Sequence, residues 1–345
     1  MRVRFKNIKI ILISLIIFLI TNLTFASEIQ DYLDELAFIG LQIQAVDIDM
    51  YLYLGWLPEE KELMKEASKK AVADLSEIRT YLLNLNLPEE LAILKDINLK
   101  TIDRLKEIYT GIEEKKDEEI KQAFNSLSEF YTQYTEKLKG VLNKYKSRDK
   151  LPENFNPINE EIKLIKDQKD KDIYLNAIKL IKDKKYKQAY KNLNDLLDKY
   201  KGTFFEDCLM LRISDCLLMV DSDIREDMFK ASEEGIKILS EIVDKNRYSP
   251  VLYEAFYKWR TKTQEFYHGM SNMSEIPNKE YNQKRWQSVQ TIKKYLVDNP
   301  NDLWAKEQIA LLLDLPNIQR GGIMGNDNLI HYGILFGGME PKEAE

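Results

Sequence analysis

The side chains best suited to acid–base chemistry are the chain's two histidines. His268 follows Glu265 at a spacing of three, and His331 follows Asp327 at a spacing of four, so a carboxylate could orient either imidazole. Nucleophilic catalysis also needs a nucleophile and an oxyanion site that converge in one cleft. The two histidines lie far apart in the sequence, and neither is accompanied by a nucleophile motif. We therefore expect no enzyme activity and no cofactor.

The two cysteines, Cys208 and Cys216, could bind a metal or form a disulfide. Both fall in one expected helix, where a spacing of eight residues corresponds to a rise of about 12 Å. That separation is too long for a disulfide between them. Their spacing from the histidines does not fit a zinc site. We expect both to be small core residues; an intermolecular disulfide in an oxidising compartment is the alternative.

The most aromatic stretch of the chain runs from Pro250 to His268. At helical spacing it carries one stripe that we expect to be buried, formed by Leu252, Phe256, Trp259, Thr263 and Phe266. A neighbouring stripe combines apolar bodies with polar tips: Tyr253, Tyr257, Arg260, Gln264 and Tyr267. Because Tyr and Arg are enriched where partners bind, we hypothesise that this second stripe lines a groove for a peptide or extended ligand. The alternative is that the tyrosines cover the core with their hydroxyls in water.

Glycines are concentrated in the C-terminal tail from Arg320 to Gly338. The segment RGGIMGND, from Arg320 to Asp327, could hold an anion with its backbone amides. However, no strand precedes it and no Gly-Lys-Ser/Thr follows, so the phosphate-loop and dinucleotide motifs are absent. We expect a turn that docks Asn328 to Leu335 as a capping helix.

The segment from Ile173 to Gly202 predicts two short amphipathic helices joined by a turn at Lys184 and Lys185. Its apolar positions recur at spacings of three and four: Tyr174, Ala177, Leu180 and Ile181, then Ala189, Leu193, Leu196, Leu197 and Tyr200. A lone helical hairpin cannot bury both stripes, so neighbouring pairs are required. We expect them at 205–220 with 227–243, at 250–268 with 281–297, and in a last helix at 302–313. The charged segment 159–171 is expected to lead into them as one helix.

Tyr186, Ala189, Leu193 and Tyr200 carry a resemblance to the tetratricopeptide repeat of bacterial envelope proteins. In that family a Lys-Tyr-x-x-Ala opens the second helix and an aromatic residue closes it. Position 201 departs from the pattern, because it is Lys where the family usually has Pro. The Pro-x₄-Gly-Gly at 316–322 resembles the helical T-component of TRAP-type transporters over about 30 residues. The resemblance implies a superhelix whose partners are proteins or extended peptides.

The first half of the chain predicts a bundle of long helices. Apolar residues keep a seven-residue period from Leu36 to Tyr53 and from Ile120 to Tyr145, with similar stripes at 63–83 and 91–112. Strand-type alternation is absent. We therefore expect an all-α protein with an antiparallel four-helix bundle at 27–146, a linker at 147–158 and a tetratricopeptide-like superhelix at 159–345 that ends in the Gly-rich cap. Oligomerisation through the bundle is compatible with this pattern.

Residues 1–26 have the pattern of a signal peptide. Arg2, Arg4, Lys6 and Lys9 precede an apolar run, and small residues end at Ala26. We expect export, followed by cleavage before Ser27. An uncleaved membrane anchor is the alternative. The mature chain would then be periplasmic, or secreted and surface-associated in a host with one membrane.

The overall charge argues against nucleic acid as a partner. Losing the four basic residues of the signal segment changes the net charge from −6 to −10, and acids are interleaved with the lysine runs. Phosphate backbones are bound by clustered Lys and Arg.

Together these patterns predict an exported, non-catalytic scaffold that binds an envelope protein or extended peptide. The alternative is a small-molecule binder or a transport-associated component.

Overall fold

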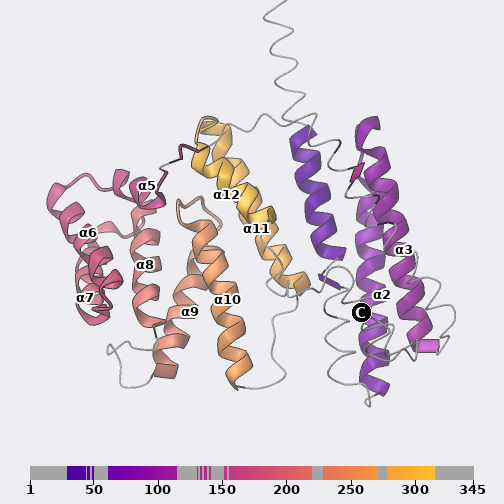
Figure 1. Ribbon diagram of the computed structural model, residues 1–345, viewed down its shortest axis with the longest axis horizontal. Coiled ribbons are helices and arrows are strands. Elements are labelled where there is room, and N and C mark those ends of the chain that lie inside the picture. Colours follow the sequence, from indigo (N-terminus) through magenta and orange to yellow (C-terminus); the bar gives the residue numbers. More distant parts are fainter. Residues whose placement is uncertain are drawn as a thin grey trace, which may run out of the picture. The chain divides into compact units, whose positions relative to one another are not determined.

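The computed structural model describes residues 29–114 apart from 44, 47–48 and 50–60, then 130, 133, 136–137 and 140, and finally 151–219 apart from 154, 228–270 and 278–314. Every regular element in these ranges is a helix (Figure 1). The chain divides into two compact units: unit 1 comprises Met1–Arg148 with Gln319–Glu345, and unit 2 comprises Asp149–Ile318. The all-α class predicted from the sequence is confirmed for the described residues.

Unit 1 contains a helical segment at 29–43, α2 at Lys61–Asn84, the short helix η1 at Glu89–Leu91 and α3 at Ala92–Glu114. A short connection returns the chain so that α3 packs against α2. All three long helices contribute to one core, whose buried members include Leu36, Leu75, Leu94 and Tyr109. Burial of such stripes, rather than helix propensity, provides most of the stability of helices of this length.

The turn between α2 and α3 is stabilised by a lysine. Lys95 donates hydrogen bonds from Nζ to the carbonyl oxygens of Leu83, at 2.9 Å, and Leu85, at 2.7 Å. These carbonyls lie at and just beyond the C-terminal end of α2, where the helix leaves acceptors unsatisfied and carries partial negative charge. Pro88 directly precedes η1, at a position where its missing N–H costs little.

The fourth bundle helix, predicted at 120–145, falls almost entirely outside the described residues. The five described positions between 130 and 140 are helical. The four-helix count therefore stays a prediction, as do the Gly-rich cap beyond Asp314 and the signal segment.

Unit 2 is a succession of helices: α5 at Pro157–Lys163, α6 at Gln168–Lys182, α7 at Tyr186–Leu197, η2 at Asp198–Tyr200, α8 at Phe204–Leu217, α9 at Met228–Asp244, α10 at Leu252–Met270, α11 at Asn278–Asp298 and α12 at Leu303–Asp314. From α6 to α10, each long helix packs against the next one in the sequence. Helices α11 and α12 pack together, and both contact α10. One continuous core runs through the unit.

The hairpin of α6 and α7 has its turn where the sequence predicted it. Lys184 adopts a left-handed backbone with φ of 57°, and α7 begins two residues later at Tyr186. Tyr174, Ala177 and Leu193 are completely buried, which confirms that the two predicted stripes face the core.

The expectation of one helix over 159–171 is wrong. Helix α5 ends at Lys163, and α6 begins after Asp167, whose side chain accepts a hydrogen bond from the backbone N–H of Asp170 at 3.1 Å. Asp167 is an N-cap, a position at which Asp competes effectively with helix continuation. The predicted linker also ends earlier than expected, because Asn156 caps α5 and Pro157 occupies its first turn.

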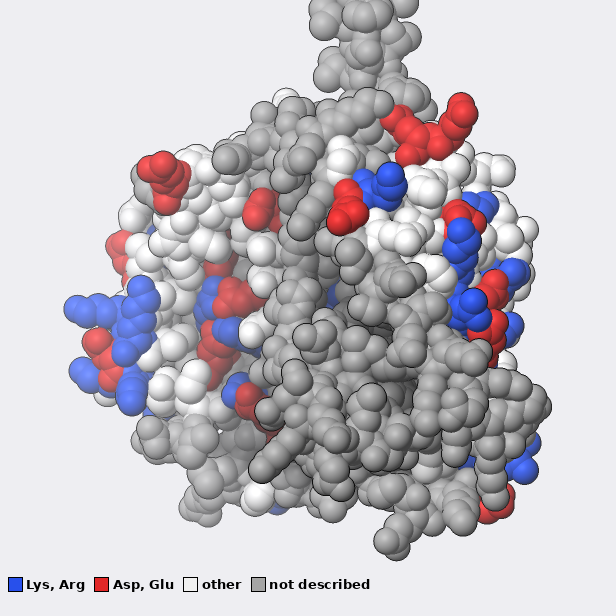
Figure 2. Space-filling view, turned by 45° about the vertical axis from the view of Figure 1, so that its right-hand side comes forward, with Lys and Arg blue, Asp and Glu red and all other residues white. Residues whose placement is uncertain are grey.

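The charged side chains of the surface are mixed in sign. Figure 2 shows Lys and Arg interspersed with Asp and Glu over the described residues of this face. Lys163 pairs with Glu160, and Lys262 pairs with Glu265, each within one helix. Exposed pairs of this kind contribute little to stability, on the order of 0.3–0.5 kcal/mol each.

Candidate functional site

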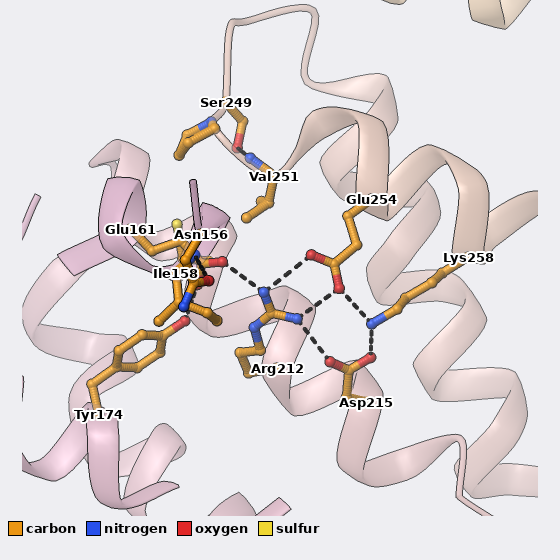
Figure 3. A network of polar contacts seen from close by, with 12 residues as sticks. Asn156, Ile158, Glu161, Tyr174, Arg212, Asp215, Ser249, Val251, Glu254 and Lys258 are labelled. Atoms are coloured by element: carbon orange, nitrogen blue, oxygen red, sulfur yellow. Dashed lines mark hydrogen bonds and ion pairs between the residues drawn. The ribbon is translucent and has the colours of Figure 1, made fainter. Parts of the chain in front are cut away.

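A buried guanidinium joins three helices of unit 2 (Figure 3). Arg212 of α8 donates from Nη2 to Glu161 of α5 at 2.6 Å and from Nη1 to Asp215 of α8 at 3.1 Å. It also forms a fork with Glu254 of α10, with Nη1 to Oε1 at 2.7 Å and Nη2 to Oε2 at 3.1 Å. We call Arg212, Glu161, Asp215 and Glu254, with Tyr174 and Lys258, the Arg212 network.

Two further donors complete the network. The Tyr174 hydroxyl of α6 donates to Oε2 of Glu161. Lys258 of α10 donates to Asp215 and lies 2.8 Å from Oε1 of Glu254. Each carboxylate therefore has at least two donors, which is what a buried charge requires to be tolerated.

The carboxylates of this network differ in their acidity. Burial raises the pKa of Glu161, although Arg212 and the Tyr174 hydroxyl favour the ionised form. Burial also raises the pKa of Tyr174, so its hydroxyl keeps its proton. Burial opposes ionisation of Glu254 as well, but the positive charges of Arg212 and Lys258 outweigh it and lower the pKa of Glu254 to about 2.

The network is arranged to hold helices together rather than to transfer protons to a substrate. A general acid must reach the atom that it protonates. The side chain of Glu161 is only 1% exposed, and Tyr174 is completely buried. What the network does is connect α5, α6, α8 and α10 through charge-assisted hydrogen bonds.

No pattern in the sequence predicted the Arg212 network. The sequence signal for it is Arg212 with Asp215 three residues later, two charged residues within the largely apolar segment from Cys208 to Leu217. Every residue of that segment is buried in α8, so an arginine there needs buried partners. Asp215 is one partner at helical spacing, but the other two carboxylates come from positions 161 and 254, and no local pattern connects those positions to 212.

A second ionic cluster fastens the start of α8 to the connection between α9 and α10. The carboxylate of Asp207 accepts from Lys245 at 2.8 Å and from Arg247 at 2.9 Å. Arg247 also donates to the carbonyl oxygen of Thr203 at 3.0 Å. These contacts cross about 40 residues of sequence and hold the α9–α10 loop in place.

The structure separates the residues of the predicted groove stripe. Tyr257 is 40% exposed, and its ring lies 6.3 Å from that of the half-buried Tyr253. Arg260 is only 6% exposed, with its guanidinium 4.2 Å from the centre of the Tyr281 ring on α11. Gln264 and Tyr267 lie in α10, but their side chains are outside the described residues.

The placement of Arg260 corrects the expectation that it faces a groove. On α10 it lies four residues from Phe256, which is buried and stacks on the same Tyr281 ring at 5.0 Å. Arg260 is buried because its long side chain places the guanidinium over the face of Tyr281 on the neighbouring helix α11. Most of the apolar stripe is buried as predicted, namely Leu252, Phe256, Trp259 and Thr263, whereas Phe266 near the end of α10 is only half-buried.

The cysteines are free and buried in α8, as expected for core residues. Burial raises the pKa of Cys208, so its thiol stays protonated and unreactive. Cys216 is buried too, with its pKa raised to about 12 by burial and the nearby Asp215. Burial leaves neither thiol at the surface for the intermolecular disulfide that the sequence left open.

The described residues hold no group of three or more His, Cys, Asp or Glu side chains placed to bind a metal ion. Nor does any helix in the described ranges have the length and apolar character needed to cross a membrane. His331 and the side chain of His268 lie outside the described residues.

Fold and contacts together define an all-α protein whose second unit is a succession of packed helices tied by buried ion pairs. No protein-family model, curated protein or solved structure matches the chain.

Proposed function

We propose that this chain is an exported, non-catalytic helical-repeat scaffold that mediates protein–protein interaction or assembly in the cell envelope. The packing of each helix from α6 to α10 against the next supports a tetratricopeptide-like superhelix. Stacked helical pairs of this kind form extended surfaces on which partners can bind. The resemblance to the tetratricopeptide repeat at Tyr186 and Ala189 supports the same architecture.

The observation that carries this proposal is the aromatic pair on α10. Tyr257 is exposed beside Tyr253, whose backbone N–H donates to Gln308 of α12 at 3.0 Å. The pair is therefore presented from a well-packed helix. A rigid, amphipathic tyrosine at a surface is a favourable anchor for a protein or peptide.

A crosslinking pull-down from the native envelope fraction tests the proposal, with Ser27 to Glu345 as bait. Tyr257→Ala is the test variant, since its exposure spares the core. Phe229→Ala is the matched control, because Phe229 is a 62% exposed aromatic on α9. We expect one or two envelope proteins to be recovered with the parent and the control and lost with Tyr257→Ala. Equal recovery with all three baits would rule out the α10 surface.

A second candidate function is the binding of a small molecule. The buried guanidinium of Arg285 on α11 favours it.

A further inference from the structure

Arg285 of α11 is a completely buried arginine with little to neutralise it. Its Nη2 donates to the Tyr281 hydroxyl at 3.2 Å, and its guanidinium lies 4.8 Å from the centre of the Tyr281 ring. Nε and Nη1 are buried without a hydrogen-bond partner. Within the described ranges, no carboxylate forms an ion pair with it.

This environment is the opposite of that of Arg212. Both guanidinium groups are buried, but Arg212 has three carboxylates and Arg285 has a neutral hydroxyl and an aromatic face. An arginine cannot escape the cost of burial by losing its proton. A buried, uncompensated charge is strongly unfavourable, so an anion is the expected complement of Arg285.

A second guanidinium lies over the ring of Tyr281. Arg260 of α10 is buried over the same ring, 4.2 Å from its centre. The electron-rich face of Tyr281 attracts each cation. Two guanidinium groups, one from α10 and one from α11, therefore share this ring.

We propose that Arg285 is the centre of a binding site for an oxyanion between α10 and α11. The planar guanidinium presents its donors in a fork that matches carboxylate and phosphate oxygens, and burial strengthens such charge-assisted bonds. The ligand class is therefore a small carboxylate or phosphate, or a larger molecule that carries such a group. The site is separate from the scaffold role, because Arg285 lies inside the unit and Tyr257 lies on its surface.

The test measures binding to the mature chain from Ser27 to Glu345 by titration calorimetry and by the shift in melting temperature. Inorganic phosphate is one probe and succinate is the other, each at constant ionic strength set with sodium chloride. A bound anion raises the melting temperature in a saturable, concentration-dependent manner. The probe that binds with the higher affinity shows whether the site prefers a phosphate or a carboxylate group. The test variant is Arg285→Met, and Arg79→Met is the control, because Arg79 pairs with the half-exposed Asp103 in unit 1.

We expect the parent and Arg79→Met to bind one probe equally well and Arg285→Met to lose at least about tenfold in affinity, in line with loss of a hydrogen bond to a charged group. In sodium chloride buffer without phosphate or succinate, Arg285→Met should melt at the same temperature as the parent or higher, because it removes an uncompensated charge.

Two results would overturn the proposal. Binding of neither probe to the parent is one. The other is a large drop in melting temperature for Arg285→Met with unchanged anion binding, which would mean that the chain itself neutralises Arg285. If Arg285→Met does not fold, Arg285→Lys keeps the charge and removes the fork. Its affinity should fall by a similar factor, and unchanged affinity would count against the site.

Discussion

At the scale of single residues, the buried arginines of unit 2 differ in what surrounds them. Arg212 is paired with Glu161, Asp215 and Glu254, and each of these carboxylates has another donor. Arg285 has no such set among the described residues. The same side chain therefore acts as a structural connection in α8 and as a proposed ligand-binding group in α11.

Removing Arg212 should strongly destabilise the protein. Arg212→Met leaves Glu161 buried and without its cation, so we expect a loss of about 3–5 kcal/mol in the free energy of unfolding. Arg79→Met, which breaks the more exposed pair with Asp103, should cost far less, because solvent screens an exposed ion pair. Urea unfolding of the three proteins gives both values. A similarly small loss of unfolding free energy for both variants would mean that the ion pairs of the Arg212 network do not form in solution.

The stability contributed by Glu254 should depend on pH in a defined direction. Its pKa is lowered from 4.5 to about 2 in the folded protein. A carboxylate with a lowered pKa stabilises the fold above its unfolded pKa, and this contribution is lost as the pH falls toward the folded value. The stability advantage of the parent over Glu254→Gln should be constant near neutral pH and shrink between about pH 4.5 and pH 2. Urea unfolding at several pH values measures it; an advantage that grows on acidification would contradict the assignment.

At the scale of elements, a close approach between helices depends on one glycine. Gly235 of α9 packs directly against the C-terminal end of α8. A Cβ added at position 235 would lie 2.8 Å from Cγ of Leu218 and 3.4 Å from Cβ of Leu217. Its carbonyl oxygen accepts a hydrogen bond from Ser214 of α8 at 3.0 Å. The fit of α8 against α9 is therefore set by the absence of a side chain at position 235.

We expect Gly235→Ala to destabilise the protein by about 1 kcal/mol or more, because overpacking outweighs the gain in helix propensity. Gly40→Ala is the matched control. Gly40 is helical, and an added Cβ would meet nothing within 4 Å, so this change should stabilise by about 0.5–1 kcal/mol. Thermal unfolding distinguishes the two. Stabilisation by both would show that α8 and α9 are not held this closely.

At the scale of the whole molecule, the chain is all-helical in its described residues and divides near Arg148 into two compact units. Each unit has its own core. Export, the scaffold role and the repeat family remain proposals, and the pull-down with Tyr257→Ala addresses the one that matters most for function.

Local sequence signals were enough to place the helices of unit 2. Apolar spacing, the turn at Lys184 and the break near 250 predicted the elements from α6 to α12 to within a few residues, because these signals are local and each is carried by neighbouring positions. The same signals misjudged the start of the unit, where the capping side chain of Asp167 outweighed helix continuation.

Which charged residues are buried, and with what partners, depends on how the helices pack against one another. Arg212 meets Glu161 across 51 positions, and Arg260 turns toward Tyr281 on the next helix instead of toward a surface. A periodic pattern states which face of a helix is apolar, but a long side chain at the margin of that face can turn either way. Its direction is fixed by the helix that packs beside it, so the long-range partners of Arg212 on α5 and α10, and the partner of Arg260 on α11, became visible only when these helices were placed together.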